Sequence, residues 1–114
     1  MQYLLLIYAE PPAVEPSQAQ FAAMMVEYNA YSDWLKGEGQ FLAGDALYPV
    51  SDATTVTVAD GRRIVTDGPF AETKEHLGGY YLIDAPDLDA AIEAAARIPG
   101  ARFGKVEIRP VLAM

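Results

Sequence analysis

The sequence predicts a single α+β domain with a ferredoxin-like βαβ-hairpin-βαβ sandwich, in which an antiparallel sheet carries two helices on one face. Three observations predict it. Residues 2–9 and 79–84 are apolar on both faces of a strand, which is typical of central strands in a covered sheet. Residues 17–36 and 88–98 have the three- and four-residue apolar spacing of helices. These patterns follow one another as β-α-β, a hairpin and β-α-β, with no repeat or linker that would divide residues 1–114.

The first half of the chain supplies a strand, a helix and a second strand. Ser17 is a suitable N-cap for the helix over 17–36, and Gly37 favours an end directly after it. A second strand is predicted over 40–48. The helix has one apolar stripe that is expected to face the sheet: Phe21, Met24, Met25, Tyr28, Tyr31 and Leu35.

A β-hairpin is predicted in the middle of the chain. Residues 54–58 and 62–66 are rich in β-branched side chains, and Asp60-Gly61 between them is typical of a tight hairpin turn. A charged loop then leads into the strand 79–84, which is apolar on both faces.

The second helix and the last strand complete the fold. Asp87 is a suitable N-cap for the helix over 88–98, and Pro99-Gly100 ends it. The many alanines of this helix allow it to lie close to the sheet, and a last strand is predicted over 103–112. The residues expected to face inward from the helix are Leu88, Ile92, Ala95 and Ile98.

The composition excludes several classes of site. The chain has no cysteine, which excludes disulfides and thiolate metal sites, and its one histidine excludes a multi-histidine metal site within a protomer. No P-loop or dinucleotide fingerprint is present, so we expect neither a metal nor a cofactor. The net charge of −8 argues against a nucleic-acid partner. The apolar run at the N-terminus is too short for a signal peptide or membrane span, so we expect a cytoplasmic protein.

The two-sided strands also predict the quaternary structure. Two helices can cover only one face of the sheet, yet the strands 2–9 and 79–84 carry large apolar groups on both. The second face needs another cover, and the sheet of a second copy is the simplest one. We therefore expect a homodimer whose sheets pack face to face.

The most unusual segment is residues 67–75, Asp-Gly-Pro-Phe-Ala-Glu-Thr-Lys-Glu, because a turn alone needs no such density of charges. Asp67 fits two roles, an acceptor for the N–H groups of the turn or an acid or base in a cleft. Phe70 is expected to close the end of the core. Glu72 and Lys74 share one side of an extended segment but not of a helical turn, so their pairing depends on the loop. A solvated charged loop is the alternative.

Five residues outside this segment are also candidates for a site. His76 titrates near neutrality by default, but a surface or capping role is the alternative. Asp45 lies in a half-apolar strand and needs a partner or a cavity, and Tyr80 offers either a hydroxyl or a core ring. Glu107 and Arg109 project from one face of the last strand, either as an ion pair in a cleft or as edge-strand charges that prevent aggregation.

The chain resembles the DGPF-motif proteins, a branch of the YCII-related family. The segments that carry the resemblance are 3–8, 44–47, 66–75, 78–83, 88–92, 98–99 and 106–111. It implies the dimeric α/β-barrel superfamily. YCII-related proteins resemble small cytoplasmic enzymes with a His–Asp pair, some acting on cyclic or chlorinated aromatic compounds. That histidine is expected on or near the first helix, but residues 17–38 contain none, and Asp45 is a loose match to the acid. DGPF-like proteins are also associated with extracytoplasmic-function sigma factors, which implies a regulatory or sensing role.

Together the charged and hydroxyl side chains predict one small-molecule cleft per protomer. The candidate catalytic groups are Asp67, Asp45 and His76, the last at the rim. The candidate ligand-binding groups are Glu72, Lys74, Tyr80 and Arg109. Three functions remain open: a small lyase, isomerase or dehalogenase-type enzyme, a non-catalytic ligand sensor, or an interaction partner of a sigma factor. For the last function, Trp34 is the candidate docking residue, because it lies outside the apolar stripe of its helix.

Overall fold

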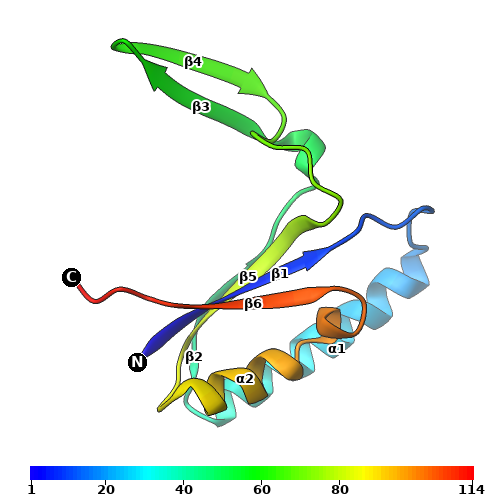
Figure 1. Cartoon of the computed structure of the whole chain (residues 1–114). Helices are drawn as coiled ribbons and strands as arrows, with labels where there is room; N and C mark the ends of the chain where they lie inside the picture. The colour runs from blue at the N-terminus through cyan, green and yellow to red at the C-terminus, as the bar shows by residue number, and fades with distance from the viewer.

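The computed structural model describes residues 1–114 and has the predicted order of elements (Figure 1). The main sheet consists of β1 (Gln2–Ala9), β2 (Phe41–Ala46), β5 (His76–Asp84) and β6 (Lys105–Pro110). A separate hairpin consists of β3 (Thr54–Ala59) and β4 (Arg62–Asp67). The helices are α1 (Gln18–Gly37) and α2 (Leu88–Ala96), and two short 3-10 turns are η1 (Val50–Asp52) and η2 (Pro99–Arg102).

The main sheet has the strand order β2-β5-β1-β6, and each neighbouring pair is antiparallel. Both helices lie on one side of it (Figure 1). The predicted ferredoxin-like fold is therefore confirmed. The two strands with two apolar faces, β1 and β5, are the central pair, as their sequences indicate.

β5 begins at His76, three residues earlier than the sequence predicts. A shift of register between Ile7 and Tyr8 brings Leu77 and His76 into the sheet opposite Tyr8 and Ala9. Gly79 lies so close to β2 that a Cβ there would sit 3.0 Å from the carbonyl oxygen of Asp45. Gly79 thus permits the close approach of the β2 and β5 backbones.

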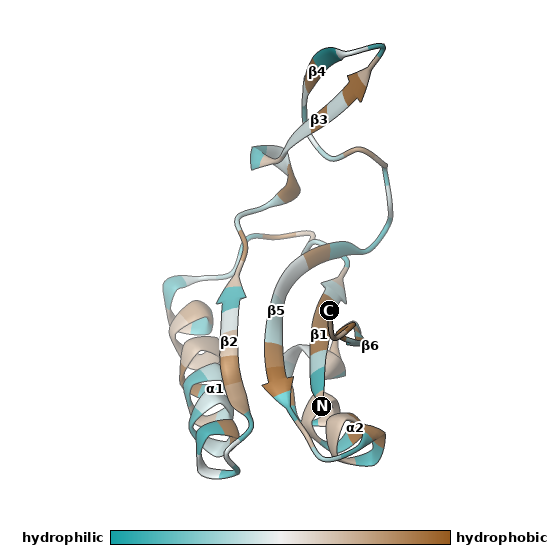
Figure 2. Cartoon of the chain, turned by 90° about the vertical axis from the view of Figure 1, so that its left-hand side faces the viewer, coloured by the Kyte–Doolittle hydropathy of each residue, from teal (hydrophilic) through white to brown (hydrophobic).

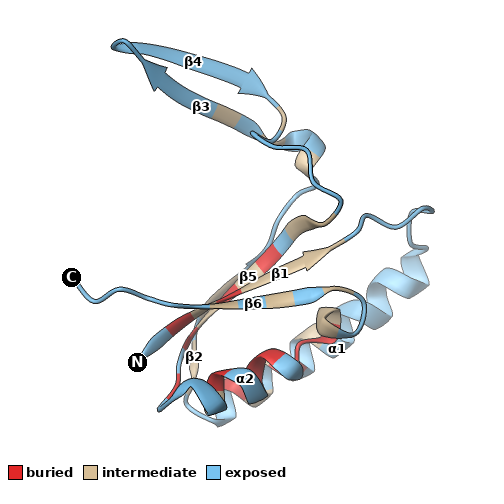
Figure 3. Ribbon diagram, in the orientation of Figure 1, coloured by how far each residue is buried: buried red, intermediate tan, exposed pale blue.

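The core lies between the helices and one face of the sheet (Figure 3). Leu5, Leu35 and Ile83 are fully buried at 0% exposure. On α2 the residues in contact with the sheet are mainly alanines: Ala91, Ala94 and Ala95 are buried. The prediction that Leu88 and Ile92 face inward is wrong, since they are 51% and 48% exposed. The small side chains bring the helix close to the sheet and leave the larger ones on its outer flank.

α1 begins as predicted, because the Ser17 hydroxyl accepts a hydrogen bond from the Gln20 N–H, and the Gln20 side chain accepts one from the Ser17 N–H. Its apolar stripe is confirmed only in the C-terminal half, where Tyr31 and Leu35 are buried. The remaining residues of the stripe are more open: Phe21, Met24 and Met25 are exposed, and Tyr28 is half-buried. The N-terminal half of α1 reaches past the end of the sheet, where no strand can cover it (Figure 1). Neither helix is long and apolar enough to span a bilayer.

The Trp34 indole is not a free docking residue. The indole packs against the core and is half-buried. The Arg97 guanidinium lies over it, 4.3 Å from the ring centroid, in a cation–π contact. The ring lines a groove between the helices together with Glu27, which pairs with Arg102. The prediction of an exposed Trp34 patch is therefore wrong, because Arg97 of α2 covers the ring.

The hairpin of residues 54–67, called here the arm, projects away from the domain (Figure 1). Its turn is the predicted one: Asp60 and Gly61 have φ angles of +51° and +73°, as a tight hairpin turn with two left-handed residues requires. Every residue of the arm except Thr55 is exposed. The prediction that Phe70 closes the core is also wrong, because this ring lies in the loop after the arm, is 90% exposed and takes no part in the core.

The first testable prediction concerns Gly104, which lies before β6. A Cβ there would collide with the carbonyl oxygen of Tyr8 and with Ala9, and these backbone atoms belong to the central strand. We expect Gly104→Ala to lower the free energy of unfolding by about 2 kcal/mol or more, measured by urea denaturation with circular dichroism. Gly37→Ala is the control, because nothing lies within 4 Å of a Cβ at that position. An equal and small effect of both substitutions would contradict the packing described.

Candidate functional site

The loop of residues 67–75, called here the motif loop, connects the arm to the main sheet. Gly68 has a φ of +94°, which a residue with a side chain rarely adopts, and its N–H donates to the carbonyl of Ala53 at 2.7 Å. The Thr55 hydroxyl donates to the carbonyl of Gly68, also at 2.7 Å. The first residues of the motif loop thus close the base of the arm. Its last residues lead directly into β5.

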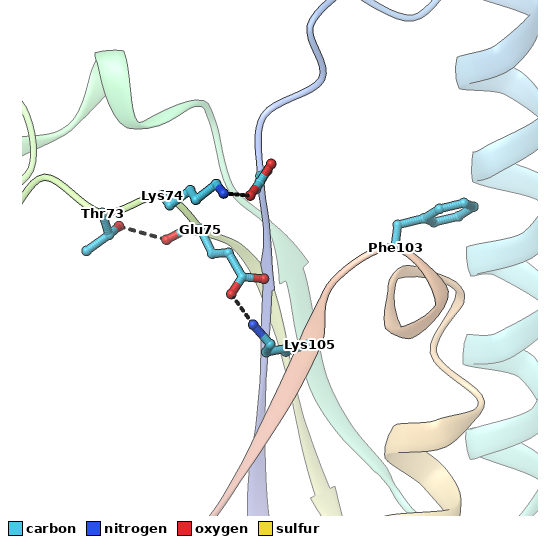
Figure 4. A pocket seen from close by; sticks show the side chains of 6 residues that line it. Thr73, Lys74, Glu75, Phe103 and Lys105 are labelled. Atoms are coloured by element: carbon cyan, nitrogen blue, oxygen red, sulfur yellow. Dashed lines mark hydrogen bonds and ion pairs between the residues drawn. The ribbon is translucent and has the colours of Figure 1, made fainter.

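The end of the motif loop borders a hollow of about 540 Å³ on the surface (Figure 4). It is called here the hollow, and its lining residues are Glu10, Thr73, Lys74, Glu75, Phe103 and Lys105. They come from the end of β1, the motif loop and the start of β6. Three segments distant in sequence therefore meet here because β1 is paired with both β5 and β6. The volume is in the range of small-molecule pockets.

Two ion pairs cross the hollow. Lys74 Nζ lies 3.2 Å from Glu10 Oε1, and Lys105 Nζ lies 2.5 Å from Glu75 Oε1 (Figure 4). Both ammonium groups are well exposed, whereas the Glu75 side chain is 29% exposed. The hydrogen bond to Glu75 raises the pKa of Lys105 above its ordinary value. The Lys105 side chain therefore remains a cation throughout the neutral range.

His76 and Thr73 hold the motif loop in place. The Thr73 hydroxyl donates to the carbonyl of Glu75 at 2.7 Å, and His76 Nε2 lies 3.0 Å from the carbonyl of Thr73. The imidazole N–H donates to this carbonyl when Nε2 carries the proton. His76 thus fixes the conformation of the motif loop through this contact, and its side chain does not line the hollow.

The side of the main sheet away from the helices, called here the open face, carries a second set of candidate residues. Side chains alternate along a strand, so the residues between the buried ones of β1 and β5 point to this side. The open face is apolar in the middle and polar at both edges, and its side chains include Leu4, Leu6, Tyr80, Leu82, Asp45, Glu107 and Arg109, with Lys105 in phase with the last two on β6. The three leucines are half-buried without any helix above them.

The polar edges of the open face differ from each other. On β2 and β5 the Tyr80 hydroxyl donates to Asp45 Oδ2 at 2.7 Å, and this bond raises the pKa of the Tyr80 phenol. On β6, Arg109 Nη1 lies 3.1 Å from Glu107 Oε2, with side-chain exposures of 69% and 47%. β6 is an edge strand of the sheet. This exposure favours the interpretation of Glu107 and Arg109 as protective edge charges.

The structure distributes the predicted site residues over three places instead of one cleft. Lys74 lines the hollow with His76 behind it, whereas Asp45, Tyr80 and Arg109 lie on the open face. Arg109 is paired with Leu4, and six residues of extended chain separate Leu4 from Glu10, about 20 Å at the rise of a strand. Lys74 and Arg109 therefore do not meet in one protomer.

The remaining two predicted residues lie outside both places. Asp67 ends β4 at the base of the arm, and Glu72 is exposed in the motif loop. Neither side chain makes a hydrogen bond or ion pair within the chain, so the interpretation of Asp67 as the acceptor of its own turn is not supported.

Sequence reasoning overlooked most of the residues that line the hollow. Lys105 has a usable signal, because it is in phase with Glu107 and Arg109 on the last strand. Glu75 belongs to the motif loop itself. Glu10 and Phe103 have no local signal, since only the pairing of strands brings them to the loop. No group of three or more histidine, cysteine or acidic side chains has the spacing of a metal site.

Comparisons with known proteins agree with the fold. A family model described as the YCII-related domain matches residues 1–114. An uncharacterised protein of Rhizobium meliloti (strain 1021) is 46% identical over 67 residues, which are 57% of this chain. The match spans 54% of the length of that relative.

The second testable prediction concerns the charge of Lys105. We expect its ammonium group to titrate above the ordinary lysine value of 10.5, because the folded protein adds a carboxylate partner. The stability that this pair contributes is present below the unfolded pKa and is lost as the pH rises through the folded pKa. NMR titration of the Lys105 side chain should show the pKa fall in Glu75→Gln and remain unchanged in Glu93→Gln, a control that breaks a pair on α2. A wild-type pKa at or below the ordinary value would contradict the pairing.

Proposed function

The chain belongs to the YCII-related family, and we propose that it binds a small molecule with an anionic group in the hollow. One observation carries this proposal: two ammonium groups from separate segments, Lys74 and Lys105, border the same hollow. Each is held by a single carboxylate in an exposed ion pair, and such pairs contribute little free energy. An anionic ligand group can therefore replace Glu10 as the partner of Lys74 at small cost.

The other walls of the hollow suit the remainder of such a ligand. Phe103 lies at the border of the hollow and is 79% exposed, but its ring points away from the two lysines (Figure 4), and the Arg102 guanidinium lies 5.3 Å from the ring centroid. Glu10 and Glu75 accept hydrogen bonds from ligand donor groups. The combination favours a small polar molecule that carries a carboxylate and a hydrogen-bond donor.

The charge state of the hollow favours binding over catalysis. A lysine that acts as a nucleophile or base needs a pKa lowered toward neutrality. Glu75 shifts the pKa of Lys105 in the opposite direction. A protonated Lys105 can hold an anion but cannot accept a proton, so ligand sensing fits this side chain better than general-base catalysis.

One observation favours a second function on the open face. Asp45 is a carboxylate that accepts a hydrogen bond from Tyr80 beside half-buried leucines. If a second copy covers this face, the pair would be enclosed in a largely apolar chamber, where Asp45 could act as a general base. This arrangement corresponds to a small lyase- or isomerase-type enzyme.

The third testable prediction concerns the binding of carboxylates. A thermal-shift screen with small aromatic and aliphatic carboxylates should give a stabilising compound, and isothermal titration should then measure its affinity. We expect Lys74→Ala and Lys105→Ala each to weaken that affinity by about tenfold or more, because each removes a charged partner. Lys36→Ala is the matched control, since this lysine lies over the Phe41 ring on another part of the surface. Equal affinity in all four proteins would refute the hollow as the binding site.

Asp45→Asn separates the two functions. The amide oxygen still accepts the Tyr80 hydrogen bond, but the group can no longer take a proton. A ligand of the hollow should bind this variant with unchanged affinity. Turnover of a compound by the wild type that disappears in Asp45→Asn would instead support the enzyme.

A further inference from the structure

We infer that the groove between α1 and α2 is a second binding site, and that it takes a small molecule with a phosphate monoester group. The groove is called here the helix groove, and its charged and aromatic walls are Trp34 and Glu27 of α1, Arg97 at the end of α2 and Arg102 of η2. Its volume is about 440 Å³, in the range of small-molecule pockets. It shares no lining residue with the hollow, so the inference does not rest on a ligand there.

The segment between the two arginines is packed firmly against α1. Ile98 is 1% exposed and belongs to the core. The Gly100 N–H donates to the Tyr28 hydroxyl at 3.2 Å, and a Cβ at Gly100 would sit only 2.8 Å from that hydroxyl. Arg97 and Arg102 flank this segment on its two sides. Their side chains therefore project from a fixed support, which a binding site needs.

The Arg97 guanidinium is held in one orientation by two contacts. It lies over the Trp34 indole, 4.3 Å from the ring centroid, and its Nε donates to Glu93 Oε1 at 2.8 Å. Neither contact uses the two terminal amino groups, which make no hydrogen bond within the chain. A guanidinium stacked on an aromatic ring keeps the donors in its own plane available for the oxygens of an anion.

Arg102 brings a second cation to the helix groove. Its Nε donates to the carbonyl of Pro99 at 3.2 Å, and its Nη2 donates to Glu27 Oε2 at 2.5 Å. Its Nη1 makes no hydrogen bond within the chain. The Arg102 and Glu27 side chains are 57% and 47% exposed, and ion pairs of this kind contribute little free energy. An anionic ligand can therefore replace Glu27 at small cost.

Two arginines with free donors favour a phosphate monoester over other anions. A monoester carries close to two negative charges at neutral pH and presents three strong acceptor oxygens. A carboxylate carries one charge and has two oxygens, so a single arginine satisfies it. Only the doubly charged group has enough acceptors to engage Arg97 and Arg102 together.

The rest of the helix groove suits a short apolar group on the ligand. Five of its nine lining residues are hydrophobic, and the exposed Ala30 and Ala96 leave space between the helices. Figure 2 shows polar and apolar turns alternating along both helices, which is typical of helices with one buried and one solvated side. Both helices lie on the side of the main sheet opposite to the open face (Figure 1), so a cover over that face would leave the helix groove accessible.

The fourth testable prediction concerns the binding of butyl phosphate, a monoester with a short apolar chain. The only tryptophan of the chain lies in the helix groove, so titration should give a saturable change of its fluorescence. Isothermal titration should then measure the affinity. We expect Arg97→Gln and Arg102→Gln each to weaken it by about tenfold or more, because each removes a charged partner. Arg62→Gln, on the arm, is the matched control and should bind as the wild type does.

Glu27→Gln tests the same site with an effect of the opposite sign. The substitution removes the carboxylate that competes for Arg102, so the affinity for butyl phosphate should rise by a few-fold. A loss of folded structure would lower the affinity and could not produce this gain. Unchanged or weaker binding in Glu27→Gln, with a native circular dichroism spectrum, would contradict the role of Arg102.

Two further ligands test the chemistry. Butyl methyl phosphate, a diester with one negative charge, and pentanoate, a carboxylate of similar length, should each bind more weakly than butyl phosphate by about tenfold or more. Three results would overturn the inference: no saturable binding at millimolar concentration, equal affinity for the monoester and the diester, or equal affinity in the wild type and both arginine variants. Binding of butyl phosphate that is lost in Lys74→Ala but kept in Arg97→Gln would assign the phosphate to the hollow instead.

Discussion

The structure depends on one constraint: two helices cover a single face of a sheet whose central strands are apolar on both. β1 and β5 bury Leu5 and Ile83 beneath the helices and present leucines of similar size on the other side. Burial of apolar surface contributes roughly 25 cal/mol per Å², so leaving these leucines half-covered forgoes a substantial part of the stabilisation available to the chain. A second layer over the open face would restore it, and a second copy of the chain is the cover that the sequence predicts. The arm is the only element that leaves the sheet on that side.

The motif loop connects this constraint to the hollow. Its first residues close the base of the arm through Gly68, and its last residues place Lys74 and Glu75 beside Glu10 and Lys105. Within nine residues, the Gly-Pro turn thus closes the base of the arm and the charged residues form the ion pairs of the hollow.

Patterns of local sequence predicted the elements well because the causes are local. The Ser17 cap, the turn at Asp60-Gly61 and the two central strands depend on residues within a few positions of each other. The stripe of α1 and the inward face of α2 were only half predictable. Periodicity identifies an apolar face, but not how far the sheet extends beneath it, nor that alanines give the closest approach.

The candidate site was less predictable for a related reason. Lys105 and Glu75 are 30 residues apart, and they meet only because β6 and β5 both pair with β1. Phe70 illustrates the same limit. A large aromatic side chain suits a core, but the arm carries the loop outward and leaves this ring 90% exposed, which no local pattern indicates.

The mass of the protein in solution tests the central claim most directly. A sheet with one bare apolar face is covered when two copies associate, and the extent of association depends on protein concentration. The account predicts twice 12.4 kDa by size-exclusion chromatography with light scattering at micromolar protein. A folded monomer of 12.4 kDa under the same conditions would contradict it.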